Sequence, residues 1–260
     1  MRKYAELTIE TAEAAFGLRE RHPDGVYRET GQGKPALHND SDDTAMLRNY
    51  IIALDVQRME AGHYTRILPL DHGSDQHATY ALYYHHMLKL YASLPDKTDP
   101  VTLEYWCYTM SQMAVLQEKA EDYKEARLIW LRIVDALAKH PRGRESKDYL
   151  YYMLHSLRKA AENESKAPTQ EGEALRLVEK ALDFAREATD ADSEPASEPD
   201  ELYRLYWMKA DMLYEAGQAK EAAPLYEQGL PLCELAHGEN PSEAVQKRIQ
   251  KARERKEYTK

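Results

Sequence analysis

Apolar and polar residues follow one another along most of the chain with the spacing of amphipathic helices. Apolar residues recur three and four positions apart in long runs, and no segment shows the sustained alternation of a half-buried strand. Glycine and proline, 11 and 12 residues in all, gather between these runs. The pattern predicts an almost all-α chain, with helices over residues 2–21, 43–61, 75–94, 100–119, 122–139, 147–163, 170–188, 199–216, 219–237 and 242–257.

Several predicted helix ends carry recognisable signals. An Asp, Asn, Ser or Glu stands beside a proline at residues 99–100, 197–200 and 240–243. This combination suits a helix start, because the first N–H groups of a helix lack helical partners, so a side chain can cap them and a proline can be tolerated. Residues 216–217 (Ala-Gly) and 140–141 (His-Pro) are typical of helix ends. These signals fix the predicted boundaries in the C-terminal two thirds of the chain.

A pattern of small and bulky residues repeats along the chain. A helix carries an alanine, a bulky residue four positions later and a third residue three positions after that, which places all three on one helical face. The alanines are 48 residues apart, and small residues at such positions let neighbouring helices approach closely. The triplets are Ala126/Trp130/Ile133, Ala174/Val178/Ala181 and Ala222/Tyr226/Gly229, with Ala78/Leu82/His85 one step earlier.

Residues 205–230 hold a small residue in a first helix, a glycine at the turn, and an alanine, an aromatic and a small residue in a second helix. In order these are Ala210, Gly217, Ala222, Tyr226 and Gly229. This segment resembles a tetratricopeptide repeat (TPR), and residues 107–140 resemble a second one. The chain departs from the family pattern at Lys209 and Gln117, where the family has apolar residues, and in its spacing of 48 residues.

The resemblance implies an all-α fold, an α-solenoid of stacked antiparallel helix hairpins, over residues 76–241. Residues 1–75 are expected to form an N-terminal helical region, and residues 242–260 a C-terminal capping helix with a narrow apolar stripe of Val245, Ile249 and Ala252. An ordinary helical bundle is the alternative fold. A basic arm is the alternative for the last segment, which holds seven Lys or Arg and three Glu.

The resemblance also implies a function, because the first helices of stacked hairpins line a concave groove that holds a peptide or a partner protein. Carried over to this chain, the groove positions on two first helices are Tyr108, Ser111, Val115 and Glu118, and Arg204, Trp207, Asp211 and Tyr214. We predict that all of these side chains contact the partner.

Tyrosine is unusually frequent, with 19 residues against only two phenylalanines. It clusters at 80–84, 105–108, 149–152 and 203–206, and three of these clusters lie where first helices are expected to begin. Tyrosine suits places where an apolar ring must meet a polar neighbour, so Tyr151 joins the predicted partner-binding residues. The alternative is that these rings are half-buried between hairpins.

The formal net charge of −10 makes nucleic acid an unfavourable partner, and residues 1–241 alone carry −14, which favours a basic protein partner. No stretch of 18 apolar residues is present, so no membrane span is expected. The first residues lack the apolar core of a secretion signal, and Cys107 and Cys233 form no paired motif. A cytoplasmic protein is the expectation.

One group of residues suggests other chemistry. His72, His77 and His85 lie in a segment rich in His and Asp, and such side chains can bind a metal. No metalloprotease, phosphate-loop or nucleophile motif accompanies them. We therefore expect a protein-binding module with no catalytic residues, metal or cofactor. A helical metal protein or enzyme built on these histidines, and a self-associating module (a homo-oligomer), are the alternatives.

Overall fold

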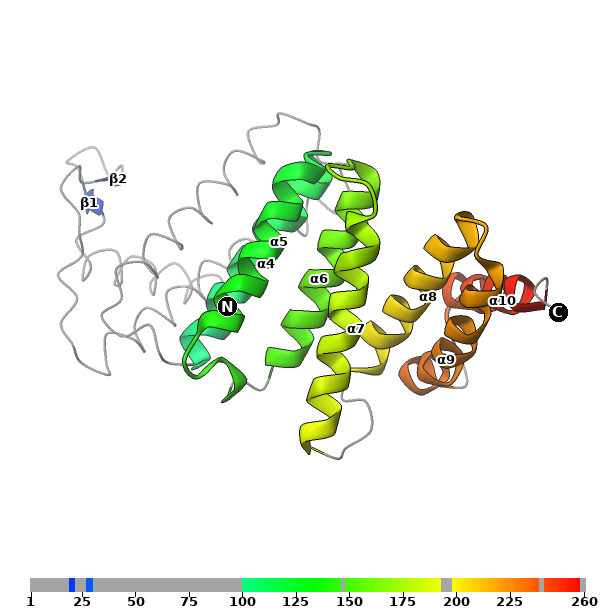
Figure 1. Cartoon of the computed structure of the whole chain (residues 1–260). Helices are drawn as coiled ribbons and strands as arrows, with labels where there is room; N and C mark the ends of the chain where they lie inside the picture. Colours follow the sequence, from blue (N-terminus) through cyan, green and yellow to red (C-terminus); the bar gives the residue numbers. More distant parts are fainter. Residues whose placement is uncertain are drawn as a thin grey trace. The chain divides into compact units, whose positions relative to one another are not determined.

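The structure, a computed structural model, describes residues 19–21, 27–29, 100–145, 148–192, 198–238 and 241–257 (Figure 1). These residues are mostly helical, which confirms the predicted helical fold. The chain divides into two compact units, one of residues 1–121 with 140–146 and one of residues 122–139 with 147–260. Each unit is described by itself.

The described residues of the first unit form two short strands, a long helix and one turn of 3-10 helix. Strands β1 (Arg19–Arg21) and β2 (Tyr27–Glu29) pair antiparallel, with Arg19 opposite Glu29. The predicted helix over residues 2–21 is therefore wrong at its end. The intervening sequence His-Pro-Asp-Gly-Val has turn-forming residues, and proline disfavours helix in the residue before it. Helix α4 (Pro100–Lys119) packs against the 3-10 turn η1 (Gly143–Glu145).

The second unit consists of helices joined by short connections. They are α5 (Tyr123–Lys139), α6 (Tyr149–Lys166), α7 (Glu173–Asp192), α8 (Pro199–Glu215), α9 (Ala219–His237) and α10 (Glu243–Glu257). Each helix packs against the next, and α6 also packs against α8 (Figure 1). The first and last residues of these helices agree with the predicted bounds to within four residues. The predicted helices over 43–61 and 75–94 lie outside the described residues.

The core of this unit contains the small residues that the repeat predicts at helix crossings. Ala126, Ala181, Ala210 and Ala222 have no exposed surface, and Ala114 of α4, in the first unit, has none either. The bulky members Trp130, Ile133, Val178 and Tyr226 are buried beside them, whereas Ala174 is only half-buried. Close packing of these faces is the source of the hydrophobic stabilisation of the helices. The residues of the earliest triplet, Ala78, Leu82 and His85, lie outside the described residues.

Helix α8 packs closely against α9 at Gly229, where the indole of Trp207 leaves no room for a side chain. A Cβ atom on this residue would lie 2.3 Å from Nε1 of Trp207, so only glycine fits without a shift of the indole. The same indole N–H donates a hydrogen bond to the carbonyl of Tyr226, at 3.3 Å. At the turn between the two helices, Gly217 has a φ of 81°, a conformation that favours glycine. The turn and the crossing together fix the hairpin.

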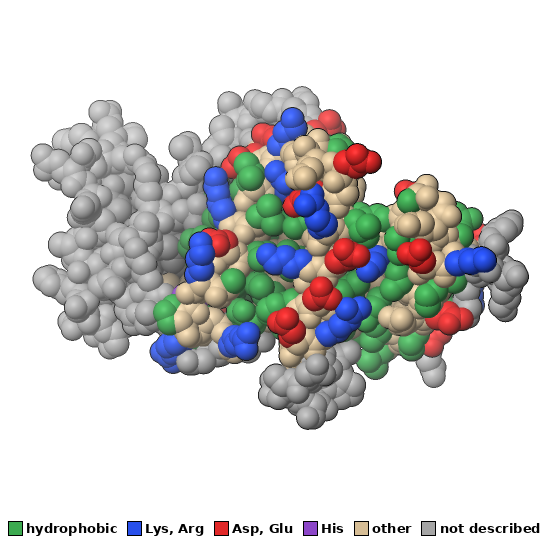
Figure 2. Space-filling model, viewed as in Figure 1, with side chains coloured by type: hydrophobic (Ala, Val, Ile, Leu, Met, Phe, Trp, Pro, Cys, Tyr) green, Lys and Arg blue, Asp and Glu red, His purple; other side chains and the backbone are tan. Residues whose placement is uncertain are grey.

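The surface of the described helices carries charges of both signs. Figure 2 shows acidic and basic side chains interspersed with apolar ones on the face in view. Among the described residues, two large apolar side chains are clearly exposed, Leu128 of α5 and Leu235 of α9.

Candidate interaction surface

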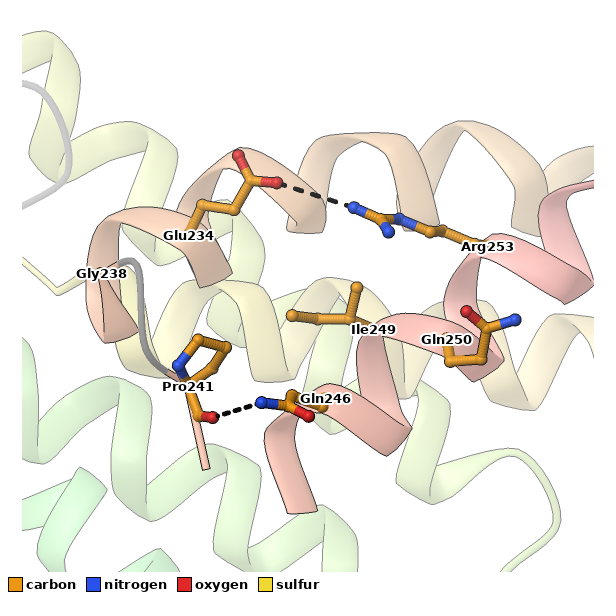
Figure 3. A pocket seen from close by; sticks show the side chains of 7 residues that line it. All are labelled: Glu234, Gly238, Pro241, Gln246, Ile249, Gln250 and Arg253. Carbon is orange, nitrogen blue, oxygen red and sulfur yellow. Dashed lines mark hydrogen bonds and ion pairs between the residues drawn. The ribbon is translucent and has the colours of Figure 1, made fainter. Parts of the chain in front are cut away.

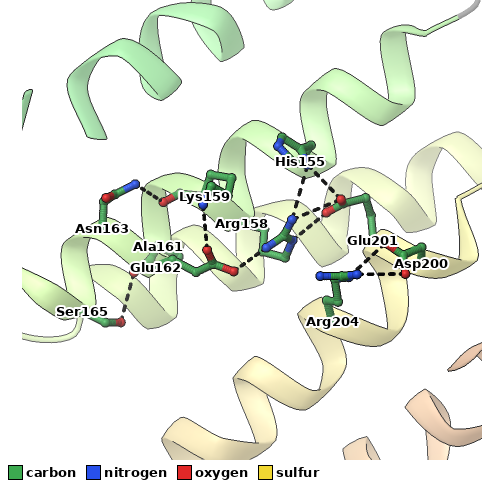
Figure 4. A network of polar contacts seen from close by, with 10 residues as sticks. All are labelled: His155, Arg158, Lys159, Ala161, Glu162, Asn163, Ser165, Asp200, Glu201 and Arg204. Atoms are coloured by element: carbon green, nitrogen blue, oxygen red, sulfur yellow. Dashed lines mark hydrogen bonds and ion pairs between the residues drawn. The ribbon is translucent and has the colours of Figure 1, made fainter. Parts of the chain in front are cut away.

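A buried group of charged side chains joins α6 to α8. Arg158 of α6 donates two hydrogen bonds to Glu201 of α8, from Nε to Oε2 at 2.6 Å and from Nη2 to Oε1 at 3.1 Å (Figure 4). His155 Nδ1 lies 2.8 Å from Oε1 of the same carboxylate, and Arg158 also pairs with Glu162 within α6. We call His155, Arg158, Glu162 and Glu201 the α6–α8 ion cluster.

The electrostatics of this cluster follow from its burial. Burial by itself would raise the pKa of Glu201, but the hydrogen bonds from His155 and Arg158 and the charge of Arg158 outweigh it and lower the pKa to about 2. Burial would lower the pKa of Arg158, and its carboxylate partners raise it instead. Both groups therefore stay charged near neutral pH, and each depends on the other for its hydrogen bonds.

More charges lie around the start of α8. Arg204 donates to Asp200 at 3.2 Å and stands over the ring of Tyr203, whose hydroxyl lies 3.0 Å from Nε2 of His237. Burial raises the pKa of Glu198, and the carboxylates of Glu201, Asp148 and Asp200 raise it further. The helix start thus holds several carboxylates whose repulsion a cation would relieve.

A second polar contact joins α8 to the C-terminal helix. Asp211 of α8 accepts hydrogen bonds from Lys251 Nζ at 2.9 Å and Arg255 Nη1 at 2.6 Å, both on α10. The guanidinium of Arg255 also lies 4.6 Å from the ring centre of Tyr214. The Tyr226 hydroxyl of α9 donates to Asp211, and burial raises the pKa of this phenol, which keeps its proton. We call these five residues the α10 contact.

The apolar stripe predicted on the last helix is confirmed. Val245 and Ala252 are buried and Ile249 is half-buried, all three packed with the α8–α9 core. Ser242 is the N-cap of the helix, since its side-chain oxygen accepts a hydrogen bond from the N–H of Val245 at 3.4 Å. Helix α10 therefore covers one face of the α8–α9 hairpin and exposes its charged face to water.

An open pocket of about 620 Å³ lies between α9 and α10 (Figure 3). Ile249 of α10 and Glu234 of α9 line it, together with Gly238, Pro241, Gln246, Gln250 and Arg253. Arg253 approaches Glu234 only to 4.0 Å across it. The apolar stripe of α10 therefore does not fill the space beside α9.

A buried carboxylate at the other end of α6, that of Glu164, stabilises the connection to α7. Glu164 pairs with Arg127 of α5 at 3.0 Å and accepts from the backbone N–H groups of Thr169 and Gln170, at 2.5 and 3.1 Å. Although burial would raise the pKa of Glu164, these donors lower it. Glu164 thus holds the connection between α6 and α7 in place.

The predicted partner-binding residues of the first unit lie on α4. Tyr108, Val115 and Glu118 are half-buried there. Ser111 is 8% exposed, and its hydroxyl donates to the carbonyl of Tyr108 at 2.7 Å. The prediction that Ser111 presents its side chain to a partner does not fit this buried place.

The predicted residues of the second unit are divided between surface and core. Tyr151 is half-buried on α6, with its ring stacked on His155, and Arg204 is half-buried on α8. Asp211 and Tyr214 lie together, but both contact α10. Trp207 is 3% exposed, so its predicted place in an open groove is wrong. The physical reason is Gly229, which leaves the indole room to pack between α8 and α9.

The α6–α8 ion cluster was not anticipated from the sequence. Glu201 lies in the first turn of a helix, where an acidic residue is common because the helix dipole stabilises its negative charge. The available signal was on α6, where His155 and Arg158 fall among the apolar positions Leu154 and Leu157. An ionisable residue on a buried apolar face requires a partner of opposite charge, so the presence of His155 and Arg158 beside these leucines indicated a buried ion pair.

The histidines of the alternative metal site, His72, His77 and His85, lie outside the described residues. Within the ranges that are described, no group of three or more His, Cys, Asp or Glu side chains could hold a metal ion. Cys107 and Cys233 are buried thiols. No helix of the described segments is long and apolar enough to cross a membrane.

Comparisons with known proteins add no assignment to the TPR resemblance of residues 107–140 and 205–230. No protein-family model, no curated protein and no solved structure matches the chain.

Proposed function

We propose that this chain is a TPR-like helical-repeat protein that binds another protein along the first helices of its hairpins. The observation that carries the proposal is the α6–α8 ion cluster, which ties one first helix to the next. In a stacked array, first helices that lie side by side form one continuous surface. The buried alanines at the predicted crossings are the second support.

The surface that we assign to the partner consists of half-buried side chains around this cluster. They are Tyr151, His155 and Glu162 on α6 with Asp200 and Arg204 on α8. An amphipathic tyrosine beside hydrogen-bonding side chains is typical of a recognition surface. Trp207 and Ser111 take no part, because they are buried.

The charge of this surface favours a basic partner. The half-buried carboxylates of Asp148, Glu162, Glu198 and Asp200 outnumber the half-buried cations of Lys159 and Arg204, since Arg158 and Glu201 are buried and neutralise each other. A cationic side chain near Glu198 would relieve the repulsion that raises its pKa. Complementary charge also speeds the encounter of two proteins.

Partner capture from the native cell tests the proposal. The wild-type chain is compared with the double variant Tyr151→Ala/Arg204→Ala, and the captured protein is then purified and titrated by calorimetry. A matched control, Leu128→Ala/Arg186→Ala, removes an exposed apolar and an exposed Arg side chain from α5 and α7. We expect the double variant to bind at least about tenfold more weakly, which is the size of one to two interface contacts, and the control to bind normally. Equal affinities for all three chains would contradict the assigned surface.

A further inference from the structure

Helix α10 is complementary, in its apolar and charged side chains, to the face of α8 and α9 that it covers. Its apolar residues form a narrow stripe, and the two cations nearest α8 contact a carboxylate there. The covered face has a matching pattern, with the rings of Tyr214 and Tyr226 in an apolar area bordered by Asp211 and Glu215. Charge and apolar surface are therefore complementary across the contact.

The fit between helix and face is incomplete. Half-buried Ile249 lines the open pocket beside α9, where a larger apolar side chain would find room. The ion pairs also remain in contact with water, since the side chains of Lys251 and Asp211 are 49% and 32% exposed. Ion pairs of this kind contribute little to stability and weaken in salt. A helix held in this way can be exchanged for a better ligand.

We propose that the face of α8 and α9 beneath α10 is a binding site for a basic amphipathic helix of a partner protein, and that α10 occupies it until the partner displaces it. The partner helix carries Lys or Arg four residues apart, as Lys251 and Arg255 are. It carries a bulkier apolar residue than isoleucine at the place of Ile249. This inference goes beyond the proposed function, because it names a partner class and a regulation for a second face of the same repeat.

The regulation follows from competition on one chain. Because α10 is joined to α9 by a few residues, its effective concentration at the face is high, and a separate helix must compete with it. The apparent affinity for the partner is the affinity of the uncovered face multiplied by the fraction of molecules in which α10 has left it. Weakening the α10 contact must therefore strengthen the binding of a separate helix.

Binding of a labelled synthetic peptide to the full chain tests this. The peptide has the sequence of residues 241–257, with Phe in place of Ile249, and fluorescence anisotropy measures its affinity. The chains compared are the wild type, Lys251→Ala/Arg255→Ala, and the control Lys247→Ala/Arg248→Ala, which loses the same charge from exposed positions of α10. We expect the first double variant to bind the peptide about fivefold more tightly than the wild type, and the control to stay within about twofold.

Two further measurements show whether the gain in affinity comes from uncovering this face. Adding Asp211→Asn and Glu215→Gln to the first double variant must abolish the gain, because these carboxylates anchor the cations. In the wild type, backbone amides of α10 must exchange with deuterium faster than those of α8 and α9, since a displaceable helix opens locally. Exchange of α10 as slow as that of α8, or equal peptide affinity for the variant and its control, would overturn the inference.

The outcome separates this inference from the proposed function. If the captured partner still depends on Tyr151 and Arg204 but the peptide does not bind better to the variant, only the α10 inference fails. If the peptide result holds and capture shows no dependence on those residues, the α8–α9 face remains a site and the α6–α8 surface does not.

Discussion

The two faces of α8 are joined to their neighbours in opposite ways. Toward α6, Arg158 and Glu201 meet with their side chains 7% and 4% exposed. Toward α10, Arg255 and Asp211 meet at the same 2.6 Å separation with 20% and 32% exposed. The distance between the charges is equal, so the difference lies in how much water each pair has lost.

This difference decides what happens when a pair is broken. A buried charge that loses its partner cannot recover the hydration it gave up, and breaking such a pair is strongly destabilising. A half-exposed charge is rehydrated when its partner leaves. The α6–α8 ion cluster is therefore a permanent connection, and the α10 contact is a reversible one. Three experiments test that contrast and a fourth tests the hairpin on which α10 lies, in order from the largest expected effect to the smallest.

Removal of Arg158 should have the largest effect. Arg158→Ala leaves Glu201 buried without its main partner, and we expect the free energy of unfolding to fall by about 3–5 kcal/mol. Urea denaturation followed by circular dichroism measures it. The control is Arg186→Ala on α7, whose exposed ion pair with Asp183 should be worth less than about 0.5 kcal/mol. Similar losses for the two variants would mean that burial does not distinguish these ion pairs.

Acid should weaken the same cluster in a defined pH range. The folded pKa of Glu201, about 2, lies below its ordinary value of 4.5. Its contribution to stability is therefore complete above pH 4.5 and is lost as the pH falls toward 2, by roughly 3 kcal/mol in total. Urea midpoints between pH 6 and 2.5 should fall more steeply for the wild type than for Glu201→Gln. Parallel curves would show that Glu201 is not the titrating group.

The close approach of α8 and α9 should respond to a single methyl group. Gly229→Ala places a Cβ atom against the Trp207 indole, and we expect a loss of about 1–3 kcal/mol in the free energy of unfolding despite the better helix propensity of alanine. Gln228→Ala, at the exposed neighbouring position, should change stability by less than about 0.5 kcal/mol. An unchanged stability of Gly229→Ala would show that the Trp207 indole or the two helices can shift at no cost.

Loosening of α10 should have the smallest effect on global stability. For Lys251→Ala/Arg255→Ala we expect a decrease of about 1 kcal/mol or less, because both cations are partly exposed. Deuterium exchange should nevertheless increase over 243–257 and remain unchanged over α6. If exchange increased equally in both helices, α10 would belong to the permanent part of the fold.

The sequence was sufficient to locate the helices of the described second unit. The apolar spacing and the glycine and proline positions predicted α8 and α9 to within one residue at each end, because local sequence determines where a helix starts and stops. The hairpin of β1 and β2 was missed. Its strands of three residues are too short to show an alternating pattern, so only the Pro-Asp-Gly sequence between them could have signalled it.

The candidate surface could be predicted only in part. Helical spacing placed Asp211 and Tyr214 on one face, but it contains no information on the segment 40 and more residues later that covers them. Trp207 was assigned from the family pattern, which does not describe the space that Gly229 leaves for an indole. Arg158 and Glu201 are 43 residues apart, so their pairing depends on tertiary packing rather than on local sequence.

The packing of Trp207 gives the protein a natural fluorescence reporter. Its indole lies within the last hairpin, hydrogen-bonded to the carbonyl of Tyr226 and shielded from solvent. Separation of α8 from α9 would hydrate that ring and move its emission to longer wavelength. Trp130, fully enclosed near α6, would keep its emission unless the whole unit melted. Opening of the last hairpin would therefore shift the emission of Trp207 without that of Trp130, whereas melting of the unit would shift both.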